Sequence, residues 1–158
     1  MNIFFLYLSA KLAASSLCDK HIIKMVLETA QLLSGAVQIL LDLEDVKLYK
    51  VTHHNHPCAV WTRESRGNFE WLISYGLELC YEYTRRYHRI HKSQAVMEYI
   101  QNKYTRLEFP SESFTMPPKC MPDQYKISNN VVECYREYYK KDKVSFAKWK
   151  YTDQPHWW

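Results

Sequence analysis

The strongest constraint on the fold is a helical pattern from about residue 15 to residue 43 that is apolar around most of its circumference. A hydroxyl at Ser15 or Ser16 is expected to cap this helix, and Asp19 falls in its first turn. At 100 degrees per residue, four of its polar residues fall within an arc of roughly 80 degrees. This stripe consists of His21, Lys24, Glu28 and Gln31. A helix with so narrow a polar face must be covered by other elements, which predicts that it lies at the centre of the fold.

The composition favours one compact all-α domain spanning residues 1–158. Hydrophobic residues make up 47% of the 158 residues, which excludes a disordered tail protein. Three glycines and six prolines are too few for a collagen-like chain or a turn-rich β fold. A chain of this length supplies one sizeable core rather than two.

About four helices are expected in total, joined by irregular segments. The first eight residues carry large apolar side chains and predict a short strand or a buried, extended lead-in. Residues 109–122 hold four of the six prolines and predict a loop. Residues 143–158 form an aromatic and basic C-terminal segment. The three helices after the central one are expected at about 62–91, 93–104 and 131–140.

Charge and cysteine content suit a soluble, intracellular protein without a membrane span. The five cysteines form no CxxC pair, and an odd count cannot close completely into intramolecular bridges. No apolar run reaches the roughly 18 residues that a membrane span needs, and the apolar start lacks a basic leader. The net charge of +4 is compatible with a phosphate-bearing partner.

The polar stripe of the central helix is the first candidate for chemistry. A carboxylate at Glu28 near Lys24 and His21 on a largely buried helix is suited to act as an acid, a base or a charge stabiliser. The alternative is a solvated face with ordinary lysine–glutamate pairing. The sequence leaves both interpretations open.

A histidine-rich segment, residues 53–58, is the second candidate, and Pro57 predicts that it forms a loop or irregular turn. Its three imidazoles and one thiol suit zinc in ligand type, but adjacent residues seldom converge on one tetrahedral ion and no second ligand pair follows at a recognised spacing. We therefore predict no metal. Instead, the segment and the basic residues after it are expected either to contact nucleic-acid phosphates or to form a surface ion-pair network. The residues concerned are His54, His56, Arg63 and Arg66.

Aromatic and basic side chains alternate near the C-terminus. Rings beside cations suit stacking on unpaired bases and contact with phosphates. The alternative is that the rings pack inward while the lysines stay in solvent. The nucleic-acid-binding candidates here are Lys148, Trp149, Lys150 and Tyr151.

The segment Leu17–His21 followed by Glu28 resembles a motif of the pyrimidine-dimer DNA glycosylases of the phage endonuclease V type. Phe69–Leu72, Arg85–Arg86 and Trp149–Tyr151 are similar to later parts of the same family. The start of the chain and its first helix also resemble a set of uncharacterised viral proteins. The glycosylase resemblance implies a compact all-α fold with the N-terminus threaded into the site, where a terminal amine attacks the sugar C1′ and forms an imine. It further implies that Glu28 stabilises the sugar cation, with His21 beside it.

The sequence departs from this family in two places. The family exposes a small second residue after removal of methionine, whereas Asn2 is bulky enough that Met1 is expected to be retained. The nucleophile is then the Met1 amine or Lys24, or there is none. In addition, the family's arginine-rich first helix is missing, since Lys24 is the only base between His21 and Lys47.

The resulting hypothesis is a DNA-directed N-glycosylase, or glycosylase/lyase, that acts on a damaged or modified base without a cofactor. One alternative is a non-catalytic nucleic-acid-binding viral protein, located in the host cytoplasm or nucleus. A second alternative is an enzyme that cleaves the glycosidic bond of a small nucleotide with the same His21, Lys24 and Glu28 pocket.

Overall fold

The computed structural model describes all residues, 1–158, and confirms the all-α class. It contains six α-helices and one short 3-10 helix, and the only β-type pairing is an isolated bridge between Ser65 and Ser111. The helices are α1 (Ala10–Ser15), α2 (Asp19–Leu41), α3 (Pro57–Glu64), α4 (Arg66–Tyr87), α5 (Gln94–Lys103) and α6 (Val131–Asp142), with the 3-10 helix at Asp123–Tyr125.

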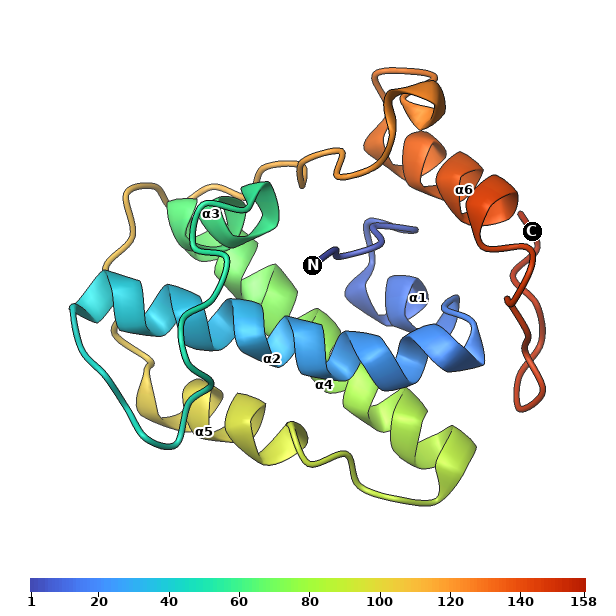
Figure 1. Cartoon of the computed structure of the whole chain (residues 1–158). Helices are drawn as coiled ribbons and strands as arrows, with labels where there is room; N and C mark the ends of the chain where they lie inside the picture. The colour runs from blue at the N-terminus through green and yellow to red at the C-terminus, as the bar shows by residue number, and fades with distance from the viewer.

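Helix α2 lies at the centre, as predicted, with α3, α4 and α5 packed against it (Figure 1). Thirteen of its 23 residues are buried. By length and composition alone α2 is apolar enough to cross a membrane, but 61% of the relevant window is buried inside the fold. The apolar side chains around α2 are therefore explained by their packing in the protein core.

The predicted start of the central helix was wrong, because Ser15 and Ser16 end a separate short helix instead of capping α2. Ser9 caps α1 through its hydroxyl, and Cys18 stands in extended conformation before α2 begins at Asp19. The Cys18 N–H donates to the Tyr139 hydroxyl at 3.0 Å instead of to a helical carbonyl. This long-range bond interrupts the helix that the local pattern predicts.

The predicted helix 62–91 was also wrong in its bounds, because the chain forms two helices that meet at Ser65. Helix α3 begins at Pro57, within the segment that was predicted to be a loop, and α4 ends at Tyr87 where His88 adopts a positive φ of 54°. At the junction, the N–H groups of Arg66 and Gly67 donate to the carbonyls of Ser111 and Glu112. Loop carbonyls therefore replace helical acceptors, and the helix breaks.

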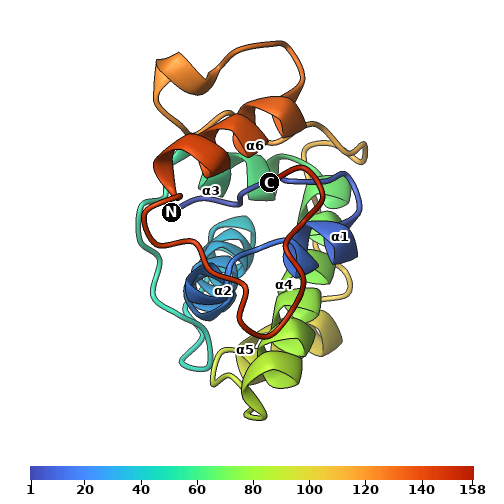
Figure 2. The same cartoon turned by 90° about the vertical axis from the view of Figure 1, so that its right-hand side faces the viewer.

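The first residues form the predicted extended lead-in, not a strand. Residues 3–6 are buried, and Figures 1 and 2 show this segment running between α6 and the layer of α2 and α4. The Tyr75 hydroxyl donates to the Ile3 carbonyl at 2.7 Å, and Arg136 donates to the Leu6 carbonyl at 3.0 Å. The start of the chain is thereby fixed from both sides.

Residues 109–122 form the predicted loop, and it is ordered against α3 and α4. The Trp61 indole donates to the Thr115 carbonyl at 3.0 Å, and Asn68 exchanges hydrogen bonds with Thr115. After α6, residues 143–158 contain no helix and run past the start of α2 and the end of α4 (Figure 2).

Candidate functional site

Glu28 lies where the start of the chain crosses the central helix. Its Oε2 accepts the backbone N–H of Asn2 at 3.1 Å, and its Oε1 lies 3.3 Å from Nζ of Lys24. The Glu28 side chain is 14% exposed, whereas that of Lys24 is 65% exposed. The predicted pairing of Lys24 with Glu28 is thus present, and the nearest main-chain donor comes from the N-terminal segment.

Asn2 positions this donor through its own side chain. The Oδ1 atom accepts the N–H groups of Ile3 at 2.7 Å and Phe4 at 3.2 Å, which turns the chain back on itself. Phe4 takes up a positive φ of 52°, a conformation that is uncommon for an aromatic residue. The Nδ2 atom of Asn2 donates to the Cys120 carbonyl at 2.8 Å. The start of the chain is therefore tied to α2 and to the proline-rich loop.

His21 shares a helix face with Glu28 but takes part in a different set of contacts. Its ring stacks on Phe4 with centroids 4.5 Å apart, and its Nδ1 lies 2.8 Å from the Tyr139 hydroxyl. Burial lowers the pKa of His21 to about 3, and the charges of Lys143, Lys24 and Lys20 act in the same direction. The imidazole is therefore neutral near pH 7 and supports the ring of Phe4.

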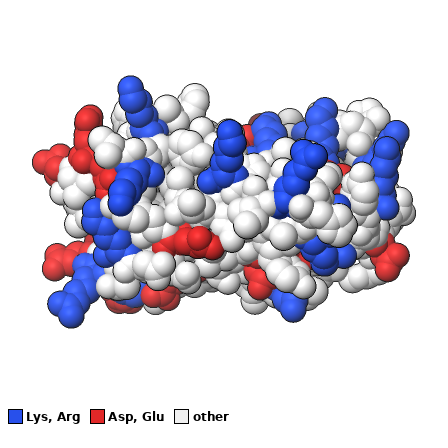
Figure 3. All heavy atoms as spheres, turned by 90° about the horizontal axis from the view of Figure 1, so that it is seen from below, with Lys and Arg blue, Asp and Glu red and all other residues white.

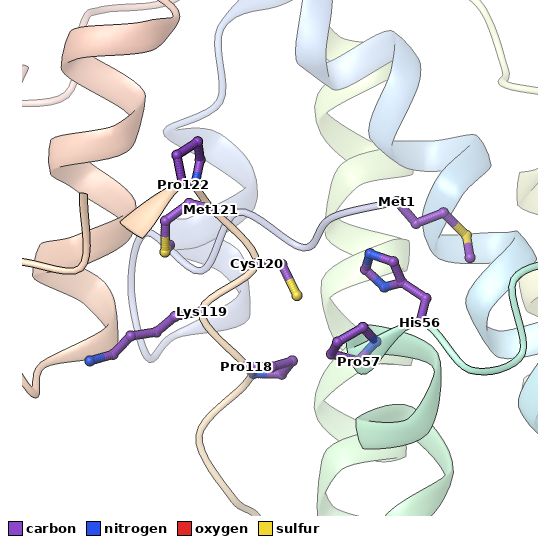
Figure 4. A pocket seen from close by; sticks show the side chains of 8 residues that line it. All are labelled: Met1, His56, Pro57, Pro118, Lys119, Cys120, Met121 and Pro122. Carbon is purple, nitrogen blue, oxygen red and sulfur yellow. The ribbon is translucent and has the colours of Figure 1, made fainter. Parts of the chain in front are cut away.

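An open pocket of about 460 Å³ lies beside the start of the chain. Its lining residues are Met1, His56, Pro57, Pro118, Lys119, Cys120, Met121 and Pro122 (Figure 4). Burial lowers the pKa of His56, the N-terminal amine lowers it further, and the Glu28 charge opposes both effects. The amine, the carboxylate and the imidazole thus belong to one electrostatic environment.

A histidine and two cysteines meet at this pocket. The possible ligand atoms of His56, Cys58 and Cys120 all lie within 4.8 Å of one another. The Cys58 thiol donates to the Cys120 sulfur at 3.5 Å, and this hydrogen bond lowers the pKa of Cys120 and raises that of Cys58. Cys120 comes from a part of the chain 62 residues beyond Cys58, so the sequence pattern around residues 53–58 gave no signal for it.

The basic residues after the histidine-rich segment, which were predicted to contact phosphates, form hydrogen bonds and an ion pair within the protein. Arg63 donates to the His54 carbonyl at 2.7 Å, and His54 itself is exposed. Arg66 forms an ion pair with Glu112 at 2.7 Å and donates to the Leu107 carbonyl at 2.8 Å. These contacts match the alternative of a surface ion-pair network for Arg66, and a role for these residues in DNA binding stays a prediction.

The C-terminal segment contacts the start of α2, whereas Glu28 lies near the middle of this helix. The N–H of Asp19 donates to the Lys148 carbonyl, and the N–H of Lys150 donates to the Asp19 carboxylate. Asp19 and Glu28 are nine residues apart on α2, or about 14 Å along its axis. Trp149 packs inward and donates to the Ser16 carbonyl, whereas the side chains of Lys148, Lys150 and Tyr151 are exposed.

Basic side chains do not form a single continuous patch on the face of the molecule seen from below. Figure 3 shows lysine and arginine side chains along the length of this face with acidic side chains among them. The net charge of +4 therefore does not by itself define a DNA-binding surface there.

Three residues that the sequence did not single out for chemistry complete the site. Asn2 supplies the N–H on Glu28, Cys120 faces His56, and Tyr75 holds the Ile3 carbonyl. Their contacts span 26 to 72 residues along the chain, and no local periodicity reports such distances.

The chain matches the model of one protein family, described as pyrimidine dimer DNA glycosylase, over residues 1–95. No curated protein and no solved structure matches it. The matched part includes the lead-in, Glu28 and the histidine-rich segment, and it covers more than half of the 158 residues. A family of DNA repair glycosylases has DNA as its partner and is typical of intracellular, soluble proteins. The chain belongs to the pyrimidine dimer DNA glycosylase family.

Proposed function

We propose that this protein removes a damaged or modified base from DNA, with an amine near the start of the chain as nucleophile and Glu28 as the catalytic carboxylate. The observation that carries the proposal is the 3.1 Å contact between the Asn2 nitrogen and Oε2 of Glu28. A short, buried lead-in brings the first nitrogens of the chain to the one carboxylate in the polar stripe of α2.

In the proposed reaction, an unprotonated amine attacks the sugar C1′ while the bond from C1′ to the base breaks. The base leaves with the electron pair of that bond and takes up a proton, and the attached amine loses a proton. The C1′–O4′ bond then breaks, its electron pair goes to O4′, which takes up a proton, and the nitrogen lone pair forms the protonated imine with C1′. The Glu28 carboxylate is placed to stabilise the positive charge that develops on the sugar and to carry protons. No cofactor takes part. If the imine is hydrolysed, the enzyme is a glycosylase. If the 3′ phosphate is eliminated from the imine first, the strand is cut and the enzyme is a glycosylase/lyase.

Three nitrogens lie near Glu28. The Met1 amine begins the chain when methionine is retained, and removal of Met1 turns the nitrogen that contacts Glu28 into the terminal amine of Asn2. Lys24 pairs with Glu28 at 3.3 Å, but its side chain is largely exposed and turned to solvent, unlike the buried lead-in. Our proposal assigns the attack to the terminal amine. His21 would position the lead-in by stacking on the ring of Phe4.

The proposed DNA contacts fall into two groups. At the pocket, we propose that His56 and Lys119 contact phosphates or the extruded nucleotide, together with His54 and Arg63 from the neighbouring segment and α3. Farther along the molecule, the exposed side chains of Lys148, Lys150 and Tyr151 are available to a more distant part of the duplex.

The test is incubation of the purified protein with oligonucleotides that carry ultraviolet photoproducts, uracil or abasic sites, in the presence of borohydride. We expect a covalent protein–DNA adduct with a damaged strand and none with the undamaged strand. Intact mass identifies the first residue of the chain, and peptide mapping of the adduct identifies the nitrogen. Glu28→Gln is expected to lose base release while keeping its helix content. The control Glu64→Gln, at an exposed position on α3, is expected to keep base release.

Three outcomes would count against the proposal. Salt-sensitive DNA binding without adduct or cleavage on any damaged strand would favour a non-catalytic binding protein. Release of base from a free nucleotide but not from DNA would favour the small-nucleotide enzyme. Normal trapping in Glu28→Gln would remove Glu28 from the chemistry.

A further inference from the structure

His56, Cys58 and Cys120 bring an imidazole and two thiols to one point of the molecule. Their possible ligand atoms lie within 4.8 Å of one another, and the two sulfurs are 3.5 Å apart. With zinc–sulfur bonds of 2.3 Å, two thiolates on a tetrahedral zinc ion are about 3.8 Å apart. The spacing of the two sulfurs is thus close to that of a metal site, and Figure 4 shows Cys120 and His56 reaching the pocket from two facing segments of the chain.

The three residues are held in place by their backbone surroundings. His56 and Cys58 flank Pro57 at the start of α3, and the His56 Nδ1 accepts the Cys58 N–H at 3.2 Å. On the facing loop, the Tyr135 hydroxyl donates to the Pro118 carbonyl at 2.8 Å and lies 3.3 Å from the Cys120 nitrogen. The cluster is therefore built from two ordered segments.

We propose that His56, Cys58 and Cys120 bind one transition-metal ion of the zinc class, with the fourth coordination position open to the pocket beside Met1. Both thiols would release their protons to solvent, so the two thiolates and the neutral imidazole balance the charge of a divalent ion. No oxidant or reductant is needed.

Metal binding accounts for the cluster better than a disulfide does. A disulfide requires a sulfur–sulfur distance near 2.05 Å and makes no use of the imidazole. In an intracellular protein, a pair of cysteines with a histidine favours a metal site over a structural bridge. Coordination through Nε2 of His56 leaves the bond from the Cys58 N–H to Nδ1 intact, and coordination through Nδ1 replaces that one bond with a metal bond.

The site would have a structural consequence for the start of the chain. The Cys120 carbonyl accepts Nδ2 of Asn2 at 2.8 Å, and Asn2 in turn reaches Glu28. A metal ion that ties Cys120 to α3 would hold the loop on which Asn2 rests. Formation of the site does not depend on the proposed glycosylase activity, so the two proposals fail independently.

The test uses the full chain, reduced and treated with a chelator, and then titrated with Co²⁺ alone. We expect one equivalent to bind with the absorption bands of tetrahedral, thiolate-ligated cobalt, and Zn²⁺ to displace it. Cys58→Ser and Cys120→Ser should each weaken binding by more than about 100-fold, the upper end of the loss for outer-shell partners. The control Cys80→Ser, at a buried thiol on α4, should bind as the wild type does.

Circular dichroism checks that each variant is folded. If the two serine variants unfold, thiol labelling of the wild type replaces them, and Zn²⁺ is expected to slow the labelling of Cys120, which is partly exposed. The proposal is overturned if cobalt bands are absent, if Cys120→Ser binds cobalt normally, or if Zn²⁺ leaves the labelling rate unchanged. Protein isolated with Cys58 and Cys120 joined by a disulfide despite added zinc would identify a redox pair instead.

Discussion

The guanidinium of Arg86 lies 3.2 Å from the carboxylate of Asp19, and its side chain is fully buried. The same group pairs with Glu82 at 3.0 Å and donates to the carbonyls of Leu17 and Ser15, each at 2.8 Å. Arg86 thus joins the end of α4 to the chain between α1 and α2, where the helix breaks.

Replacement of Arg86 by methionine should destabilise the protein by about 3–5 kcal/mol, because Asp19 would lose its buried cationic partner and the two carbonyls their donor. Urea unfolding followed by circular dichroism measures the change. The matched control is Arg85→Met, since Arg85 contacts the same Glu82 at 2.7 Å but is 39% exposed. A loss under about 1 kcal/mol is expected there. Equal losses in the two variants would contradict a special role for burial.

The elements that sequence reasoning predicted well are those in which local pattern and tertiary structure agree. Helix α2 repeats its apolar face over 23 residues, so the signal is strong and the helix is central. The errors at Cys18 and Ser65 have one physical cause. In both places a distant group, the Tyr139 hydroxyl or the carbonyls of residues 111 and 112, takes a backbone N–H that the helix would otherwise use.

The candidate site divides in the same way. Glu28 was predicted as a candidate from its place in the polar stripe of α2, which is a local property. Asn2 and Cys120 were not found, because their significance arises from contacts made across the fold. The spacing argument against a metal considered only residues 53–58, whereas the structure adds a thiol from the proline-rich loop.

The buried His21 predicts a loss of stability in mild acid. Its pKa is about 3 in the folded chain and near 6.5 when exposed, so the unfolded state binds more protons between these values. Stability should therefore fall as the pH drops below about 6.5, by about 1.4 kcal/mol per pH unit once the unfolded imidazole is protonated. The Tyr139 hydroxyl contacts the ring, and the charges of Lys143, Lys24 and Lys20 act on it.

Unfolding experiments between pH 7 and pH 5 test this prediction. His21→Gln keeps a polar group near Tyr139 but removes the titration, so its stability should fall by about 2 kcal/mol less than that of the wild type over this interval. Because both proteins carry the same carboxylates, the effect of these groups on stability cancels when the two pH curves are compared. Parallel pH curves would mean that His21 is accessible to protons in the folded state.

Two glycines should respond to alanine in opposite directions. A Cβ atom on Gly67 would lie 2.5 Å from the Phe114 nitrogen and 2.8 Å from its Cα, and backbone at that distance must move. Gly67→Ala should thus displace the proline-rich loop and cost about 1–3 kcal/mol. At Gly35 in α2 nothing lies within 4 Å, so Gly35→Ala should stabilise the protein by about 0.5–1 kcal/mol. Thermal or urea unfolding gives both signs, and a stabilised Gly67→Ala would show that the loop is not held as described.

In the C-terminal segment, DNA contact and packing can be tested separately. Its lysines Lys148 and Lys150 hydrogen-bond to α2 through their backbone and not through their side chains. The Lys148 carbonyl and the Lys150 N–H hold Asp19, so Lys148→Gln and Lys150→Gln leave these bonds intact. If both ammonium groups meet phosphates, the slope of log affinity against log salt should fall by about 0.9 for each substitution. Fluorescence anisotropy with duplex DNA measures the slope. Lys50→Gln, at an exposed residue outside the segment, is the control and should leave the slope unchanged.

Trp149→Phe should instead lower stability, since the indole loses its bond to the Ser16 carbonyl at 3.1 Å. Unchanged slopes in both lysine variants would assign the segment to packing alone, because a side chain that neutralises a phosphate must release a counterion.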